Sequence, residues 1–370
     1  MNTEMNLQQI GRSKRTVIIC LTAMFMLIAG YSSAAVNTLL NSGTWETPAN
    51  WSTGSIPTDA DDVIIPGDIV VTINSSAICG SLTFGDMGAA SSITISGSNS
   101  LTIATSGGRN GNLYFNPNNN TELYQLNVNA GSLTVEGQVV SGGNNGGGIV
   151  VTTGSVLFSS TATMIWGEAV NVTINGTGNV TFNGDLSLST VSSGFTSFSL
   201  TNSGSFIFNG AVTQSDASYT ISNTGTAGNF YFNDGYDISA GTFTTMNGTN
   251  IYASTAFNNS GSSLVLDPGS NFIVNANTSI TPTSAINLGD VIMNSGNTLT
   301  LNGNISVAGD WTNNGGTLTP NTSTVSFNSA TAKSINGTAA SQTFYNVEVA
   351  LGAGQALSIG GSTTTFTTNS

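Results

Sequence analysis

Two carboxylates, Asp234 and Asp237, have the most suitable spacing for acid–base chemistry in this sequence. They lie beside Tyr231 and Tyr236, and a carboxylate pair can supply the acid and the base of glycoside hydrolysis. The chain contains no histidine, which excludes Ser-His-Asp and Cys-His catalysis and His-ligated zinc. The spacing of the pair is not diagnostic, and Asp234 directly follows a strand-like segment. We therefore favour a solvated turn for this pair.

Three acidic residues near the N-terminus, Asp59, Asp61 and Asp62, are candidate ligands for calcium, the one cofactor that the sequence suggests. Calcium prefers hard oxygen ligands such as carboxylates. The segment lacks the glycine and the distal glutamate of an EF-hand loop. We favour a loop that begins a strand over a calcium site.

Two tryptophans, Trp45 and Trp51, could form a platform on which a sugar stacks. The alternative, which we favour, is that they cap the open end of a hydrophobic core, because an uncovered end exposes both core side chains and strand edges. The cysteine that follows them, Cys79, cannot form an intramolecular disulfide once the leader is removed. We expect Cys79 to be a small buried residue, as free cysteines commonly are.

The elements that would position these residues are short strands. Apolar and polar residues alternate along almost the whole chain, as in Leu133-Thr134-Val135, and glycine and asparagine bound the alternating runs. An alternation of period two is typical of half-buried strands, and glycine-rich pairs mark the turns between them. The outward column of these strands, Thr134, Leu157, Thr181, Ile207 and Tyr231, lacks the regular threonines of an ice-binding face.

An internal repeat organises the middle of the chain. Five segments of the form Gly-x-apolar-x-apolar align without gaps, and their first glycines are Gly131, Gly154, Gly178, Gly204 and Gly228. Positions two apart in a strand share a face, so the apolar columns should stack inward at about 4.8 Å per coil. The next column ends in Asn183, Asn209 and Asn233, which predicts an amide ladder at a corner.

The fold class that these columns predict is all-β, a right-handed parallel β-helix (β-solenoid) with coils of about 24 residues. Roughly 14 such coils would stack to about 65 Å. Tandem β-sandwiches are the alternative, but they do not predict in-phase apolar columns. We expect a signal peptide at 1–35, an N-terminal capping segment at 36–80 and solenoid repeats at 81–370. Strand-like sequence runs to the end, so we expect the repeats to be truncated at the C-terminus.

The export signal consists of a basic stretch from Arg12 to Arg15, an apolar run at 17–29 and small residues before a cleavage site near Val36. The run is shorter than the roughly 20 residues of a membrane span, so we expect no transmembrane anchor. Removal of the signal leaves Arg109 and Lys333 against 17 acidic residues, a net charge of −15. Nucleic acid and anionic lipid are recognised mainly through Lys and Arg, so we expect neither as a partner.

Two segments resemble known families. The W…NW…G…P…D-x-V-x-I pattern from Trp45 to Ile65 resembles the opening of β-helical adhesins and autotransporter-like passengers. The segment Ala308-Gly-Asp310-Trp311-Thr-Asn-Asn-Gly-Gly, with Phe344-Tyr-Asn-Val347, is similar to repeats of type IX-exported surface proteins of gliding bacteria. The resemblance implies a secreted or cell-surface location, associated with the outer membrane, and supplies no catalytic residues.

The function that the sequence favours is that of a non-enzymatic scaffold or adhesin, with neutral glycans or matrix components as expected partners. The acidic surface disfavours acidic glycans. The alternative is a carbohydrate-active enzyme, a polysaccharide hydrolase or lyase, on the same fold. A lyase needs a basic residue beside the substrate carboxylate, and Arg109 and Lys333 are far apart in the sequence.

Overall fold

The computed structural model describes residues 35–85, 89–115, 124–141, 147–166, 169–189, 195–261 and 264–369. The predicted signal peptide, apart from Ala35, and its cleavage motif lie outside these residues. Within them, no helix is long and apolar enough to cross a membrane. Residues 36–370 form one compact unit.

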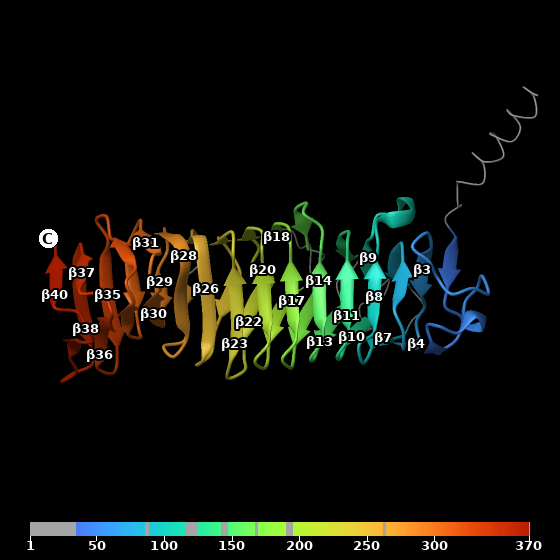
Figure 1. The fold of residues 1–370 in the computed structure, drawn as a ribbon, viewed down its shortest axis with the longest axis horizontal. Coiled ribbons are helices and arrows are strands. Elements are labelled where there is room, and N and C mark those ends of the chain that lie inside the picture. The colour runs from blue at the N-terminus through green and yellow to red at the C-terminus, as the bar shows by residue number, and fades with distance from the viewer. Residues whose placement is uncertain are drawn as a thin grey trace, which may run out of the picture. The chain divides into compact units, whose positions relative to one another are not determined.

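This unit is an all-β solenoid of about 13 turns with roughly 23 residues each, as the repeat predicted. Most turns contribute one strand to each of three faces, and all the paired strands run parallel (Figure 1). Because equivalent strands of successive turns pair side by side, hydrogen bonds run from turn to turn along the stack. In-register parallel stacking excludes the β-sandwich alternative.

The first face contains β1 (Val36–Thr38), β3 (Asp62–Ile65), β6 (Ser81–Phe84), β9 (Leu113–Phe115), β12 (Val139–Ser141), β15 (Met164–Ile165), β18 (Leu186–Leu188), β21 (Val212–Gln214), β24 (Tyr236–Ile238), β31 (Thr298–Leu301), β34 (Thr317–Thr319), β37 (Ser341–Phe344) and β40 (Thr365–Thr368).

The second face contains β2 (Gly43–Thr44), β4 (Val70–Ile73), β7 (Ser91–Ile95), β10 (Tyr124–Val128), β13 (Gly147–Val151), β16 (Val170–Ile174), β19 (Thr196–Leu200), β22 (Tyr219–Asn223), β25 (Thr242–Thr244), β27 (Leu264–Val265), β29 (Ile286–Leu288), β32 (Ile305–Val307), β35 (Thr324–Ser329) and β38 (Asn346–Leu351).

The third face contains β5 (Ala77–Cys79), β8 (Ser100–Ile103), β11 (Ser132–Val135), β14 (Ser155–Phe158), β17 (Asn179–Phe182), β20 (Ser205–Phe208), β23 (Gly228–Phe232), β26 (Thr249–Asn259), β28 (Asn271–Pro282), β30 (Asp290–Met293), β33 (Trp311–Asn313), β36 (Lys333–Gly337) and β39 (Leu357–Ile359). The long strands β26 and β28 continue from this face into the first. Two 3-10 turns, η1 (Pro48–Asn50) and η2 (Ser106–Gly108), lie in the connections.

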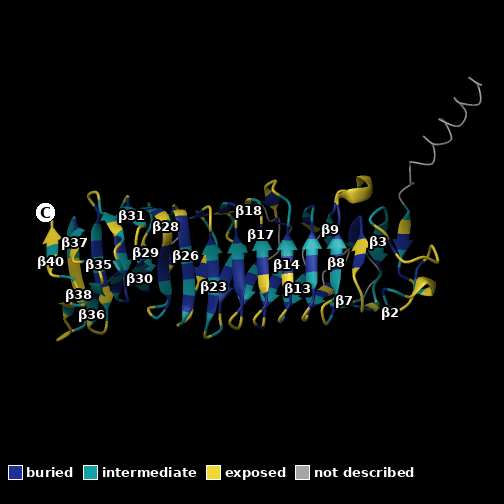
Figure 2. Ribbon diagram, in the orientation of Figure 1, coloured by how far each residue is buried: buried dark blue, intermediate teal, exposed yellow. Residues whose placement is uncertain are grey.

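The inward columns are the ones that the repeat predicted. Phe182 pairs in register with Phe208, and Phe208 with Phe232. Their rings stack at 5.3 and 5.2 Å between centroids. All three side chains are buried, and buried positions recur along most of the stack (Figure 2). The predicted asparagine ladder also forms, with Asn209 Nδ2 donating to Asn183 Oδ1 (3.1 Å) and Asn233 Nδ2 donating to Asn209 Oδ1 (2.9 Å).

The glycine that begins each repeat is required by close approach between turns. A Cβ atom on Gly178 would lie 2.5 Å from the carbonyl oxygen of Gly154, and one on Gly204 would lie 2.5 Å from that of Gly178. These separations are too short for any side chain. The glycine column therefore sets how closely consecutive turns can pack at this corner.

The turn length changes after Tyr236, where the sequence repeat loosens. The asparagines of the first ladder, Asn183, Asn209 and Asn233, are separated by 26 and 24 residues. Asn229, Asn250 and Asn271 are separated by only 21 residues each. The register between β26 and β28 also shifts between Ala253 and Thr255, and Thr255 adopts a positive φ of 59°. The turns nevertheless continue to stack through β40.

Residues 36–80, predicted as a capping segment, already contribute strands to all three faces. β1 pairs with β3 on the first face, β2 with β4 on the second, and β5 with β8 on the third. An irregular loop containing η1 lies between β2 and β3. The handedness of the solenoid stays a prediction.

Candidate functional site

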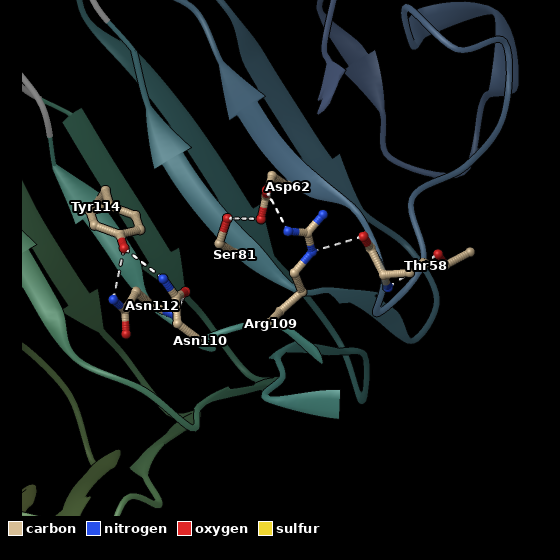
Figure 3. A network of polar contacts seen from close by, with 8 residues as sticks. Thr58, Asp62, Ser81, Arg109, Asn110, Asn112 and Tyr114 are labelled. Carbon is tan, nitrogen blue, oxygen red and sulfur yellow. Dashed lines mark hydrogen bonds and ion pairs between the residues drawn. The ribbon is translucent and has the colours of Figure 1, made fainter. Parts of the chain in front are cut away.

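The acidic segment near the N-terminus is held by protein partners. Asp61 Oδ2 accepts hydrogen bonds from the Thr58 amide (2.7 Å) and hydroxyl (2.8 Å). Asp62 accepts the Ser81 hydroxyl at 2.6 Å and forms an ion pair with Arg109 at 3.1 Å (Figure 3). In the described ranges, no group of three or more His, Cys, Asp or Glu residues is arranged to hold a metal ion. The structure does not bring Asp59, Asp61 and Asp62 together as calcium ligands.

Arg109 instead ties the loop after η2 to an earlier turn. Its Nε donates to the carbonyl oxygen of Ala60 at 3.0 Å, 49 residues back in the chain. The Arg109 side chain is only 17% exposed. The Arg109 side chain passes over Gly80, and a Cβ atom on Gly80 would collide with the methylene groups of Arg109. Because the guanidinium joins turns that do not follow one another directly, this network has a structural role.

The two tryptophans are packed inside the first turns. Trp45 and Trp51 are 0% and 2% exposed, their rings meet edge-to-face at 4.8 Å, and Trp51 Nε1 donates to the Trp45 carbonyl oxygen at 2.7 Å. A sugar-stacking platform needs an exposed ring face, so this placement corrects the platform interpretation. The burial agrees with the capping role that we favoured.

The carboxylate pair and its tyrosines are spread over different surfaces. Asp234 is an exposed turn residue, Asp237 lies on β24 of the first face, and Tyr231 lies on β23 of the third. Tyr236 points into the core, where its hydroxyl donates to Gln214 Oε1 at 2.8 Å. Burial, and then the Asp237 charge, raise the pKa of Tyr236 well above its ordinary value. The tyrosine is therefore a neutral core group and not an acid for bound substrate.

Cys79 is buried and free, as predicted. Burial raises the pKa of its thiol far above the ordinary value, and the charges of Asp62 and Asp61 raise it further. A thiol that stays protonated is a poor nucleophile. Cys79 is a core residue in this structure.

A second pair of carboxylates, which the sequence did not single out, occupies adjacent turns. Asp290 Oδ1 accepts the backbone amide of Asp310 at 2.7 Å, and Asp310 Oδ1 accepts that of Ser334 at 2.7 Å. Burial raises the pKa of Asp290, and the negative charge of Asp310 raises it further. The hydrogen bond from the Asp310 amide and the positive charge of Lys333 lower the pKa but do not cancel the rise. Asn304 Oδ1 makes the equivalent bond to the Thr324 amide at 2.8 Å. These side chains hydrogen-bond each turn to the next, so the role of the aspartates is structural.

An open groove of about 510 Å³ lies on the second face, across β29, β32, β35 and β38. Its outward column runs from Ser306 through Ser326 to Glu348, which pair in register. The other residues that line it are Ala285, Ile286, Asn304, Ile305, Thr324, Asn328 and Ala350. A volume of this size lies within the range of small-ligand sites.

The lining of this groove is polar and weakly charged. Hydroxyl groups and amides outnumber the single carboxylate, Glu348, and small alanine side chains leave room between them. Asn304 is fixed by its bond to the Thr324 amide. Such a lining can donate and accept several hydrogen bonds at once. With one carboxylate, it lacks the pair that glycoside hydrolysis requires.

No protein-family model, no curated protein and no solved structure matches this chain.

Sequence reasoning missed this groove because its residues are common types in unremarkable positions. Ser306, Ser326 and Glu348 become neighbours only through the register of β32, β35 and β38. The number of residues between them is set by the shorter turns of the C-terminal part, where the sequence repeat does not align without gaps. The pairing of Asp62 with Arg109 was missed for a similar reason, since it joins residues two turns apart.

Proposed function

We propose that this protein is an exported, non-enzymatic scaffold or adhesin, secreted or held at the cell surface, and that it binds neutral glycans. The groove on β29, β32, β35 and β38 carries this proposal. Its hydroxyl and amide lining suits ligands that present many hydroxyl groups. The continuous stack of turns suits a scaffold, because each added turn extends the surface without changing the fold.

Charge supports the choice of neutral ligands. With a net charge of −15 after loss of the leader, the chain repels acidic polysaccharides over distances of about a Debye length. Glu348 adds a local negative charge within the groove itself. Neutral glycans avoid both repulsions and keep the hydrogen bonds.

The direct test is binding of the purified protein to a panel of neutral and acidic polysaccharides, measured by titration calorimetry. Ser326→Tyr places a bulky side chain in the middle of the groove and should weaken binding at least tenfold, about 1.4 kcal/mol. Thr173→Tyr is the matched control, because Thr173 is an outward residue of β16 on the same face, far along the chain. Equal loss in both variants, or no binding by the wild type, would exclude the groove.

An assay for new reducing ends or unsaturated products, with and without calcium, separates this proposal from the enzyme alternative. The scaffold proposal expects no turnover. Turnover that disappears in Asp234→Asn, Asp237→Asn or Glu348→Gln would replace the scaffold with a carbohydrate-active enzyme. Glu348→Gln keeps the hydrogen-bonding capacity of the side chain, so binding alone should survive it.

A further inference from the structure

We propose that the outer surface of the third face, from β14 to β30, is a contact surface for a second copy of this chain, so that two solenoids lie side by side. The centre of this surface is an outward row on seven strands: Leu157, Thr181, Ile207, Tyr231, Tyr252, Ile273 and Ile292. We call this row the apolar ridge. It goes beyond the glycan groove, which lies on the second face.

The apolar ridge is unbroken by polar residues from Ile207 to Ile292. Thr181 separates this part from Leu157, and Ile273 is only 9% exposed. Tyr231 and Tyr252 stack in parallel with their ring centroids 4.3 Å apart and an angle of 5° between the rings. Ile207 precedes them and Ile273 follows them in the same register. With the ring faces packed against each other, the row offers a flat strip of ring edges and aliphatic groups. A contiguous apolar strip on a soluble surface marks an interaction site more often than scattered apolar residues do.

The equivalent outward row on the second face has a different composition. It runs through Asn127, Val150, Thr173, Ser199 and Ser222. Small hydroxyl residues dominate it, and Val150 is its one aliphatic member. The apolar ridge is therefore a property of the third face and not of solenoid turns in general.

Amide ladders border the apolar ridge on both sides. On one side, Asn250 Nδ2 donates to Asn229 Oδ1 at 3.0 Å, and Asn271 Nδ2 donates to Asn250 Oδ1 at 2.8 Å. On the other side lies the ladder of Asn209 with its two neighbours. Because these amides already bond to one another, covering them removes fewer hydrogen bonds with water than covering isolated amides would. Both borders can be buried at low cost.

Charge and area identify a second copy as the occupant. Among the residues of these strands, Asp290 at the far end is the only charged one, whereas the whole chain carries −13. Two like-charged copies approach most easily through a face without charge. Seven strands at about 4.8 Å, each showing about five residues at about 3.3 Å, give roughly 500 Å². Two such faces reach about 1,000 Å², the lower end of specific interfaces, so the association should be weak.

The test is sedimentation velocity of the purified protein from about 10 μM to about 1 mM, at low and high salt. The dimer fraction should rise with concentration in the micromolar to millimolar range and with salt, because salt screens the repulsion between the two acidic copies. Tyr252→Asp places a charge in the apolar ridge and should weaken dimerisation at least tenfold. Thr173→Asp adds the same charge on the second face and should leave the dimer unchanged.

A cysteine within the apolar ridge gives an independent readout. Ile207→Cys should form an intermolecular disulfide under mild oxidation, whereas Thr173→Cys should not, and Cys79 is buried in both. Far-UV circular dichroism checks that each variant is folded. A wild type that stays monomeric at the highest concentration and salt would overturn the proposal. So would a dimer that survives Tyr252→Asp but is lost in Thr173→Asp, or a ridge that binds polysaccharide while the protein remains monomeric.

Discussion

The phenylalanine-stacked turns around β20 and the last described turn, β38 to β40, have the same alternation of apolar and polar residues but very different burial. Phe208, in the middle of the stack, is 0% exposed, whereas Val349 and Ile359 are 54% and 49% exposed. Val349 pairs with the buried Phe327, and Ile359 with the buried Ile335, so both belong to inward columns. The difference lies in the neighbours, because a middle turn is covered on both sides and the last described turn on one.

The first turns bury their inward side chains by a different arrangement. Trp45, Trp51 and Leu39 are all at most 2% exposed, although no described turn lies before them. The loop between β2 and β3 folds these large side chains over the core, and Leu39 forms an isolated bridge with Trp51. Burial in this fold therefore depends on what covers a turn as well as on the alternation within it.

Phe208→Ala is the sharpest test of that comparison and has the largest expected effect. Removing the ring leaves a cavity between Phe182 and Phe232, which should lower the free energy of unfolding by about 3–5 kcal/mol. Ile359→Ala, in the half-exposed column, should cost less than about 1 kcal/mol because the site is open to water. Urea unfolding followed by circular dichroism measures both. Similar losses in the two variants would contradict the role of neighbouring turns.

Gly178→Ala examines the spacing of the same turns. The new methyl group would lie 2.5 Å from the Gly154 carbonyl oxygen, and forcing atoms into packed structure costs about 1–3 kcal/mol or more. Gly360→Ala is the control, because no heavy atom lies within 4 Å of its added Cβ. The comparison is again made by urea unfolding. A neutral Gly178→Ala would mean that the turns are not packed as closely as described.

Asn209→Ala removes the middle of the exposed amide ladder. Two side-chain hydrogen bonds are lost, one to Asn183 and one from Asn233. Since water can replace them at an exposed corner, we expect a loss of about 1 kcal/mol. Asn202→Ala, whose side chain accepts a hydrogen bond from the neighbouring Ser203 amide, serves as the control. A ladder that mattered to the fold as much as the inward column would show a loss near that of Phe208→Ala.

Asp290→Asn has the smallest expected effect and the clearest dependence on pH. The folded state raises the pKa of Asp290, so any stability from its protonated form is present below the unfolded pKa and is lost as pH rises through the folded pKa. Asparagine keeps an Oδ1 acceptor for the Asp310 amide and carries no charge. At neutral pH the variant should equal or exceed the wild type by a few tenths of a kcal/mol, since half-exposed charges are screened. The difference should vanish in acid, which thermal melts at several pH values can check.

The sequence predicted the inward columns and the Asn183–Asn233 ladder because both follow from period-two alternation and a nearly constant turn length. It did not predict that Tyr231 stacks on Tyr252, because that pairing needs the shorter turn of 21 residues between β23 and β26. The groove was out of reach for the same reason, since Ser306, Ser326 and Glu348 are neighbours only after three turns are set in register. The burial of Trp45 and Trp51 followed from the capping argument, but their mutual contact did not.

The direction of the hydrogen bonds between turns has a mechanical consequence. These bonds point along the stack, so a pull on its two ends acts parallel to them. The bonds between one pair of turns then break before those of the next pair, and many bonds are not sheared at once. Each released turn would free about 23 residues of chain. The Arg109–Asp62 ion pair would resist separation of the N-terminal turns, because it must break before the turns that it joins can move apart. Under tension, the solenoid would thus lengthen stepwise, one turn at a time.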